Sequence, residues 1–259
     1  MKVAVITGAS AGIGKACALL FREKGYKVYN LSRKSAEGFE SIPTDVSDRE
    51  NVFSSIAQVA EKEGRIDVLI NSAGMGISGA VEDTDDAAVR RIFDVNYFGT
   101  VYAIQAVIPV MRASGGGTII NMSSAGAPLS LPFQAFYSST KSAVSTLSEA
   151  LRIEVKPFNI KVSTILPGDV KTEFTARREK NKSNSVYYGE RIDKSVARME
   201  KDELNGMPPE VIAKIAYRLS RQNNPPVYVV GGVSYKLLVA LSRYLPKRLI
   251  VRAIGKLYG

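Results

Sequence analysis

Histidine is absent from this chain of 259 residues, and cysteine occurs once, at Cys17. The absence of histidine excludes serine–histidine triads and histidine-ligated metals, so we expect no metal centre. A single thiol cannot form an internal disulfide. Its neighbours Ala16 and Ala18 favour a buried, apolar role for Cys17 in an expected helix.

Long apolar runs are also missing, since no stretch reaches the roughly 18 residues that suggest a membrane-spanning helix. Met1 leads directly into an apolar segment, which leaves no room for a signal peptide. We therefore expect a cytoplasmic protein. The net charge of +10 is compatible with anionic lipid, acyl-carrier protein or merely a basic surface. No nucleic-acid-binding motif accompanies it, so we expect no nucleic-acid partner.

Short apolar segments alternate with longer segments of helical pattern. This alternation predicts an α/β fold, a doubly wound, Rossmann-like parallel sheet of about seven strands with helices on both faces. We expect a single domain over residues 1–259. The expected strands are 3–7, 27–31, 41–44, 66–71, 118–122, 161–166 and 227–230. The expected helices are 12–24, 48–63, 84–113, 136–156 and 208–222.

The first expected strand passes directly into Gly8-Ala-Ser-Ala-Gly-Ile-Gly14 and then into a helical segment. Such a turn directs backbone N–H groups and the positive end of the helix dipole at one point, which suits a pyrophosphate. The spacing differs from the commoner Gly-x-Gly-x-x-Gly pattern. Turns also use glycine for positive φ alone, so this motif needs support from the rest of the chain.

Tyr137 and Lys141 are four residues apart in an expected helix and would lie on the same face. A phenol has an ordinary pKa of about 10, and a nearby ammonium lowers that pKa because it stabilises the phenolate. The pair is therefore a candidate proton donor with a charged neighbour. An ordinary amphipathic surface pair has the same spacing, and the pair alone leaves both interpretations open.

Six motifs follow one another along residues 1 to about 172, with Ser124 thirteen positions before Tyr137. Together they resemble the short-chain dehydrogenase/reductase family. One departure is Ser72, where the family more often has asparagine, but the first asparagine and the glycine of that motif are retained. The motifs are Thr7-Gly-Ala-Ser-Ala-Gly-Ile-Gly14, Asn71-Ser-Ala-Gly74, Asn96, Ser124, Tyr137-x-x-x-Lys141 and Pro167-Gly168.

The resemblance implies hydride transfer between a nicotinamide cofactor and a carbonyl or alcohol. Hydride addition leaves negative charge on the carbonyl oxygen, so the site needs a hydrogen-bond donor and an acid. The resemblance gives these catalytic roles to Ser124 and Tyr137. It implies that Lys141 lowers the pKa of the tyrosine and holds the nicotinamide ribose. It also implies that Asn96 interrupts a helix and holds a water of a proton relay; an amide satisfied by helix packing is the alternative.

Cofactor contacts are implied in the glycine-rich turn, after several strands and at the catalytic pair. By resemblance, Asp45 accepts from the adenine amine, although an acidic helix cap at Asp45 or a cap at Ser47 is the alternative. The implied contacts are Gly8, Ser10, Ala11, Gly12, Ile13, Gly14, Ser32, Arg33, Asp45, Val46, Asn71, Ala73, Gly74, Tyr137, Lys141, Pro167, Gly168, Val170 and Thr172.

The end of the second expected strand lacks an acidic residue. Ser32 stands where family members that prefer NAD carry an aspartate, and Arg33 follows it. A carboxylate there would repel a 2′-phosphate, whereas an arginine can bind the phosphate and stack on adenine. We therefore expect NADP(H) as the cofactor. Ordinary solvated loop charges at Arg33 and Lys34 are the alternative.

The substrate is less well specified. Residues 173–207 are polar and occupy the place of the family's substrate lid. We expect a hydrophobic carbonyl compound such as a steroid, a retinoid-like aldehyde or an acyl ketone. A 3-oxoacyl-carrier-protein-type reductase, a sugar or polyol dehydrogenase and a non-enzymatic cofactor-binding regulator are the alternatives. The residues that suggest an apolar pocket, and that could equally pack the helix on the sheet, are Ala125, Ala127, Leu129, Leu131, Phe133 and Phe136.

The segment 234–259 is basic and amphipathic, contains no acidic residue and loosely resembles steroid and retinol-type family members. It either covers the substrate pocket, pairs subunits or makes a peripheral membrane contact, as a membrane-surface protein would. By resemblance we expect a homodimer or homotetramer that pairs through residues 90–113 and 136–156. The apolar stripe, broken at Pro246, is Leu237, Leu238, Leu241, Leu245, Leu249 and Ile250.

Overall fold

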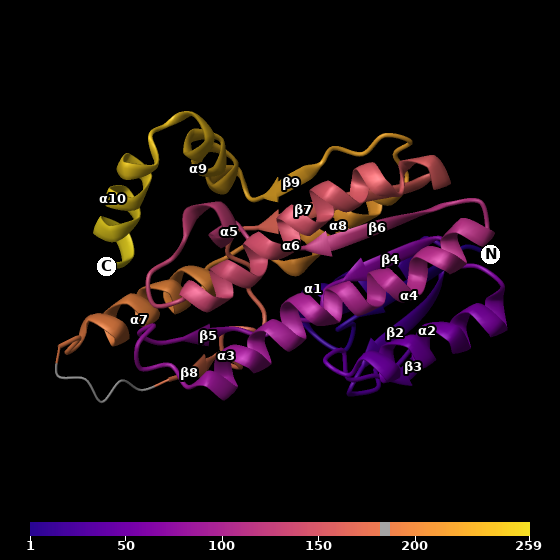
Figure 1. Cartoon of the computed structure of the whole chain (residues 1–259), viewed down its shortest axis with the longest axis horizontal. Coiled ribbons are helices and arrows are strands. Elements are labelled where there is room, and N and C mark those ends of the chain that lie inside the picture. Colours follow the sequence, from indigo (N-terminus) through magenta and orange to yellow (C-terminus); the bar gives the residue numbers. More distant parts are fainter. Residues whose placement is uncertain (182–186) are drawn as a thin grey trace.

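The computed structural model describes residues 1–181 and 187–259. Its centre is a seven-stranded parallel sheet in the order β3-β2-β1-β4-β6-β7-β9, with helices on both faces (Figure 1). The expected fold class is confirmed. The strands of this sheet are β1 (Val3–Thr7), β2 (Lys27–Ser32), β3 (Glu40–Pro43), β4 (Val68–Asn71), β6 (Gly117–Met122), β7 (Ile160–Pro167) and β9 (Tyr228–Gly231).

Helices connect these strands, and a separate two-stranded sheet pairs β5 (Ile77–Ser78) with β8 (Glu179–Lys180). None of the helices in the described ranges is both long and apolar enough to cross a membrane. The helices are α1 (Gly12–Glu23), α2 (Arg49–Glu63), α3 (Asp86–Phe93), π-helix η1 (Asp94–Phe98), α4 (Gly99–Ala113), α5 (Gly126–Leu129), α6 (Ala135–Glu154), 3₁₀-helix η2 (Lys156–Phe158), α7 (Arg191–Leu204), α8 (Pro209–Ser220), α9 (Val233–Tyr244) and α10 (Lys247–Tyr258).

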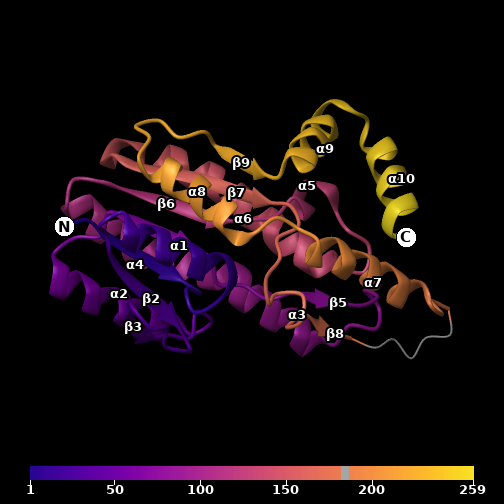
Figure 2. The ribbon, with the colours of Figure 1, turned by 180° about the vertical axis from the view of Figure 1, so that it is seen from behind.

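Strand alternation explains why both faces of the sheet are covered. Val3 and Val5 pack with α2, α4 and α6 on one face, whereas Ala4 and Ile6 pack with α1 and α8 on the other. Figures 1 and 2 show these two helical layers from opposite sides. Cys17 is fully buried in the second layer, as expected, and burial raises the pKa of its thiol to about 12.

The expected helical segment over 84–113 is interrupted in the middle. It divides into α3, the π-helical turn η1 and α4, with Asn96 inside the turn. The hydroxyl of Thr100 donates to the carbonyl of Asn96 at 3.0 Å, which gives that carbonyl a partner where the regular ladder is broken. Helices α5 and α7 and the small β5–β8 sheet were not expected, because their signals are short or lie in polar sequence.

The strand order reverses at β1, which lies between β2 and β4. In doubly wound sheets such a reversal opens a crevice beyond the carboxyl ends of the strands, where ligands bind. The glycine-rich turn follows β1 at this point, and the N–H of Gly8 donates to the carbonyl of Leu31 in β2 at 3.0 Å. The fold therefore places the expected cofactor turn at the reversal.

The C-terminal helices form an arm beyond β9 (Figures 1 and 2). Helix α9 packs on β9 and α5, and α10 packs on α5 and α7. The backbone breaks between them at Pro246, where the apolar stripe was expected to be interrupted. Part of the expected lid, 182–186, lies outside the described residues.

Candidate active site

The glycine-rich turn is built for a close approach of strand and helix. Gly8 has φ +71°, and a Cβ on Gly14 would lie 2.3 Å from the carbonyl oxygen of Gly8. Helix α1 begins at Gly12 with Ala11 as its N-cap, and no side chain caps its first N–H groups. These donors and the positive end of the helix dipole fit a phosphate group.

The end of β2 presents Arg33 to solvent and turns Ser32 inward. Ser32 is buried, and its hydroxyl donates to Oδ1 of Asn30 at 2.6 Å. Arg33 is exposed, and among the described residues its side chain makes no hydrogen bond or ion pair with another residue. Of these two expected contacts, the arginine is the one with a charged group available for a ligand.

Asp45 forms a local turn rather than a helix cap. Hydrogen bonding from the Ser47 hydroxyl at 2.6 Å is the main cause that lowers the pKa of Asp45, and the charge of Arg33 adds to it. Helix α2 is capped by Asp48, which accepts from the N–H of Asn51 at 3.1 Å. The alternative that Asp45 or Ser47 caps this helix is therefore wrong. Val46 is buried nearby.

The motif after β4 begins with a buried asparagine and continues into a loop. Asn71 is buried, and its amide donates to Oδ1 of Asn121 in β6 at 2.9 Å. Its side chain thus joins two central strands. The hydroxyl of Thr7 accepts from the N–H groups of Ser72 and Ala73, both at 3.1 Å. These bonds fix the loop that leads to Gly74 beside the glycine-rich turn.

The two serines after β6 have different surroundings. Ser123 is buried, and its hydroxyl donates to the carbonyl of Lys141 at 2.8 Å. Ser124 is half-buried and close enough to Tyr137 to lower the pKa of the phenol. Its hydroxyl accepts from the N–H of Gly126 at 3.0 Å. The structure therefore brings together Ser124 and Tyr137, as the resemblance implies.

Burial raises the pKa of Tyr137 to about 12, and the neighbouring Ser124 opposes this rise. The expected lowering by Lys141 is not found. The Nζ atom of Lys141 lies 5.8 Å from the centre of the tyrosine ring and donates to the carbonyl of Met122 at 3.0 Å. Burial lowers the pKa of Lys141 to about 8, so the lysine loses its proton, and with it its positive charge, as the pH rises through that value.

Asn96 links the loop after β4 to α6, the helix that carries Tyr137 and Lys141. Its Oδ1 accepts from the N–H of Met75 at 2.8 Å, and its Nδ2 donates to the carbonyl of Met75 at 3.0 Å. Nδ2 also lies 3.2 Å from the hydroxyl of Thr140 in α6. The interruption of the helix at Asn96 is found, while its role in a proton relay stays a prediction.

The loop after β7 closes over the glycine-rich turn. The carbonyl of Pro167 accepts from the N–H of Ala125 at 2.8 Å, and Gly168 donates to Gly231 at 3.0 Å. Val170 forms a parallel bridge with Met207. Further along, a Cβ on Gly12 would lie 3.4 Å from the side chain of Thr172. Of the expected loop contacts, Thr172 thus lies next to the expected phosphate site.

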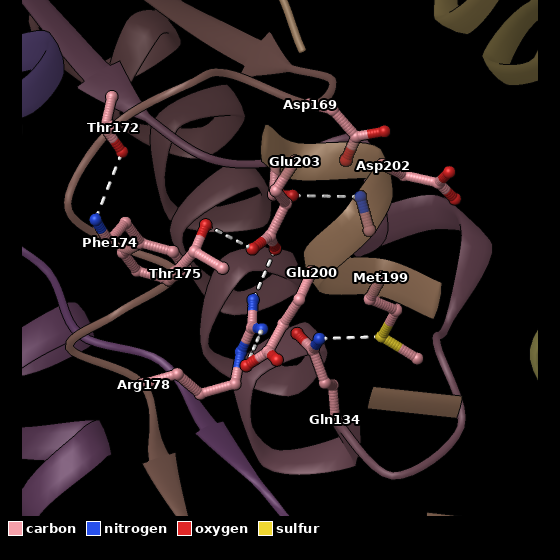
Figure 3. Close-up of polar contacts among 12 residues, drawn as sticks. Gln134, Asp169, Thr172, Phe174, Thr175, Arg178, Met199, Glu200, Asp202 and Glu203 are labelled. Carbon is pink, nitrogen blue, oxygen red and sulfur yellow. Dashed lines mark hydrogen bonds and ion pairs between the residues drawn. The ribbon is translucent and has the colours of Figure 1, made fainter. Parts of the chain in front are cut away.

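A buried ionic cluster near Tyr137 was not expected. The guanidinium of Arg178 pairs with Glu203 and lies 3.7 Å from Glu200, while Thr175 donates to Glu203 at 2.7 Å (Figure 3). Glu203 raises the pKa of Tyr137, and Arg178 lowers it. The sequence signal was slight, because arginine and glutamate in a polar segment normally face solvent.

Of the six residues expected to line an apolar pocket, Ala127 is buried and the other five pack in separate places. Leu129 and Leu131 pack against α10, and Ala125 packs with β7, β9 and α9. Phe133 packs near α7, whereas Phe136 lies in the same cluster as Tyr137. Most of these residues therefore pack helices, strands and loops against one another. Phe136 is the member of the set that packs in the cluster of Tyr137.

Comparison with known proteins decides the family. A family model described as short chain dehydrogenase matches residues 2–183. The chain belongs to the short-chain dehydrogenase family. It is 37% identical over 264 residues to a 3-ketodihydrosphingosine reductase of Bacteroides thetaiotaomicron, covering 100% of this chain and 98% of that protein.

The structure of a short-chain dehydrogenase from Streptomyces avermitilis is also similar, with TM-score 0.84 and 29% identity, covering 98% of this chain and 96% of that one. Similar solved structures include complexes with NADH and with NADP. The family expected from the motifs is confirmed. The protein is an oxidoreductase of a family that binds nicotinamide cofactors.

Proposed function

We propose that this short-chain dehydrogenase interconverts a carbonyl and a hydroxyl group on a hydrophobic substrate and uses NADP(H). The observation that carries the proposal is the grouping of Ser124, which lowers the pKa of Tyr137, with Tyr137 itself and with Lys141 buried one helical turn further along α6. This group lies beyond the carboxyl ends of β6 and β4, on the same edge of the sheet as the glycine-rich turn.

Tyr137, Ser124 and Lys141 have separate roles in the proposed reaction. With a pKa of about 12, Tyr137 holds its proton at neutral pH and can donate it to a developing alkoxide. The hydroxyl of Ser124 stabilises the same oxygen. The bound cofactor supplies or accepts the hydride. Lys141 is held beside them by the Met122 carbonyl, where a ribose hydroxyl can exchange for that contact.

Cofactor preference rests on charge at the end of β2. Arg33 is an exposed cation that makes no hydrogen bond or ion pair in the described ranges, although its charge acts on Asp45, and Ser32 stands where an aspartate would repel the phosphate. The free N–H groups at the start of α1 hold the pyrophosphate, and Arg33 holds the 2′-phosphate. NADPH is therefore the proposed cofactor.

An apolar substrate is supported by the aromatic surroundings of the acid. The rings of Tyr137 and Phe174 are 5.7 Å apart, and Met75 and Phe136 pack in the cluster around Tyr137. The similar protein named 3-ketodihydrosphingosine reductase suggests the first compound to test, a long-chain ketone. The expected lid, cytoplasmic location and homo-oligomeric state stay predictions.

The test is oxidation of NADPH and NADH by the purified enzyme with a panel of carbonyl compounds. The panel contains 3-ketodihydrosphingosine, a steroid ketone, a 3-oxoacyl thioester, an aldose and small aromatic ketones, and Tyr137→Phe is the blank. We expect turnover of a long-chain ketone with NADPH that is absent in the blank. Turnover confined to the thioester or the aldose would replace the substrate proposal, and equal use of NADH would replace the cofactor proposal.

A further inference from the structure

Helix α9 carries an exposed apolar stripe. Val233, Leu237, Leu241 and Tyr244 are 84%, 65%, 41% and 86% exposed. Their spacing of four, four and three residues places them on one face of the helix. The opposite side packs through Val239, which is buried against β7 and β9. Large apolar side chains gathered on one solvent-facing stripe indicate a surface that binds a partner.

Helix α10, which follows α9 after Pro246, carries a basic stripe. Ile250 and Ile254 are 4% and 3% exposed and pack against α5. Arg248, Arg252 and Lys256 also recur every four residues, and helical geometry places them on the side opposite these isoleucines. None of the three forms an ion pair with a carboxylate in the part of the chain that the structure describes.

The composition of this arm selects among partners. No acidic residue occurs after Glu210, so the arm has no side-chain carboxylate that could neutralise its cations. In a two-fold symmetric contact each arm would meet its own copy, and the cations would repel one another. An anionic bilayer provides both an opposite charge for the basic stripe and an apolar layer for the leucines.

We propose that the α9–α10 arm docks this protein on the surface of a membrane that contains anionic lipid. The arm lies at one end of the molecule and projects from the sheet (Figures 1 and 2), so a flat surface can reach it. Binding needs no turnover and no cofactor. Its test is therefore separate from the test of the reaction.

The experiment is co-sedimentation of the full-length protein with two kinds of vesicle, phosphatidylcholine alone and phosphatidylcholine mixed with phosphatidylglycerol. An apolar variant carries Leu237→Ser, Leu241→Ser and Tyr244→Ser. A matched control carries Val81→Ser and Ile153→Ser, whose side chains are 60% and 77% exposed elsewhere on the molecule.

A charge variant carries Arg248→Gln, Arg252→Gln and Lys256→Gln. Its control neutralises three exposed lysines outside the arm, Lys2, Lys201 and Lys214, in the same way. Circular dichroism and thermal unfolding establish that each variant folds, which exposed substitutions normally permit.

We expect the wild-type protein and both controls to sediment with the anionic vesicles and to be released by high salt, because salt screens the basic stripe. The apolar and charge variants should each bind at least about tenfold more weakly. Wild-type protein that stays in the supernatant would overturn the proposal, as would equal losses in variants and controls. A change in oligomeric state of the apolar variant, with unchanged sedimentation on vesicles, would assign the surface to a second copy instead.

Discussion

The guanidinium group of Arg178 is sealed from solvent against the carboxylate of Glu203, which ties the segment after β7 to helix α7 (Figure 3). Phe174 stands between this ion pair and the acid, with its ring 5.7 Å from the Arg178 guanidinium and 5.7 Å from the ring of Tyr137. The pair therefore has two roles. It supports Phe174 beside Tyr137, and it holds α7 against the segment after β7.

Removing one partner of this pair should destabilise the fold. In Glu203→Gln, the buried guanidinium keeps its charge and loses the nearer of its two counter-charges, with Glu200 still 3.7 Å away, so we expect a loss of about 3 kcal/mol in the free energy of unfolding. Urea denaturation measures it. Glu190→Gln is the control, because Glu190 and Lys194 form an exposed pair at the start of the same helix, and we expect little change there. Equal stability of the two variants would contradict this account.

Tyr137→Phe removes the proposed acid and leaves the ring in place. We expect turnover to fall by about a hundredfold or more, because general acid catalysis is lost, while the affinity for NADPH changes little. Steady-state kinetics and cofactor fluorescence titration separate the two effects. Tyr26→Phe, a buried tyrosine in the layer of α1 and α8, is the control and should keep its activity. Retained turnover in Tyr137→Phe would assign the acid elsewhere.

Lys141 should give the protein a stability that increases at alkaline pH. Its pKa is about 8 in the folded state, against an ordinary value of 10.5. Between these pH values the unfolded chain binds the extra proton, so unfolding becomes less favourable as the pH rises, by up to about 3 kcal/mol. Urea denaturation of the wild type and Lys141→Met at pH 8, 9 and 10 checks this difference. Parallel pH profiles of the two proteins would show that the lysine keeps an ordinary pKa.

Arg33→Asp should exchange the cofactor preference. The new carboxylate repels a 2′-phosphate and accepts hydrogen bonds from ribose hydroxyls, so we expect NADPH binding to weaken at least about tenfold, or 1.4 kcal/mol, and NADH binding to improve. Isothermal titration with both cofactors measures the change. Lys34→Asp alters the charge one position further on and should have a smaller effect. If NADPH is still preferred in Arg33→Asp, the phosphate lies on other residues.

Two helical glycines should respond oppositely to alanine. In Gly14→Ala the new methyl would meet the Gly8 carbonyl at 2.3 Å, whereas at Gly255 nothing lies within 4 Å. We expect Gly14→Ala to lower the melting temperature and weaken cofactor binding, since strand and helix must separate. Gly255→Ala should raise the free energy of unfolding by about 0.5–1 kcal/mol, because alanine favours the helix. Normal cofactor binding by Gly14→Ala would show that the turn tolerates the methyl group.

The sequence by itself determined the fold class and the positions of most central strands. The run Val3–Thr7 is apolar up to Ile6 and buried at every position because a parallel strand is covered on both faces. Helical periodicity placed Tyr137 and Lys141 on one face of a helix, and the family resemblance, rather than spacing alone, placed Ser124 beside them. The family followed from the same short motifs.

Tertiary structure decided what each side chain does. Ser32, Asn71 and Ser123 carry polar groups that the sequence leaves free for a ligand, but packing turns them into the protein, where they bond Asn30, Asn121 and Lys141. The π-helical turn at Asn96 depends on bonds to Met75, 21 residues earlier.

Arg178 shows the same limit most clearly. Its burial depends on Glu203, 25 residues away in the chain, so no local pattern reveals it. Likewise, helical periodicity identified an apolar stripe in the C-terminal segment, but only the folded arm separates Ile250, which is buried, from Leu237, which is exposed. Periodicity fixes which residues share a face, and the contacts between distant segments fix which face meets solvent.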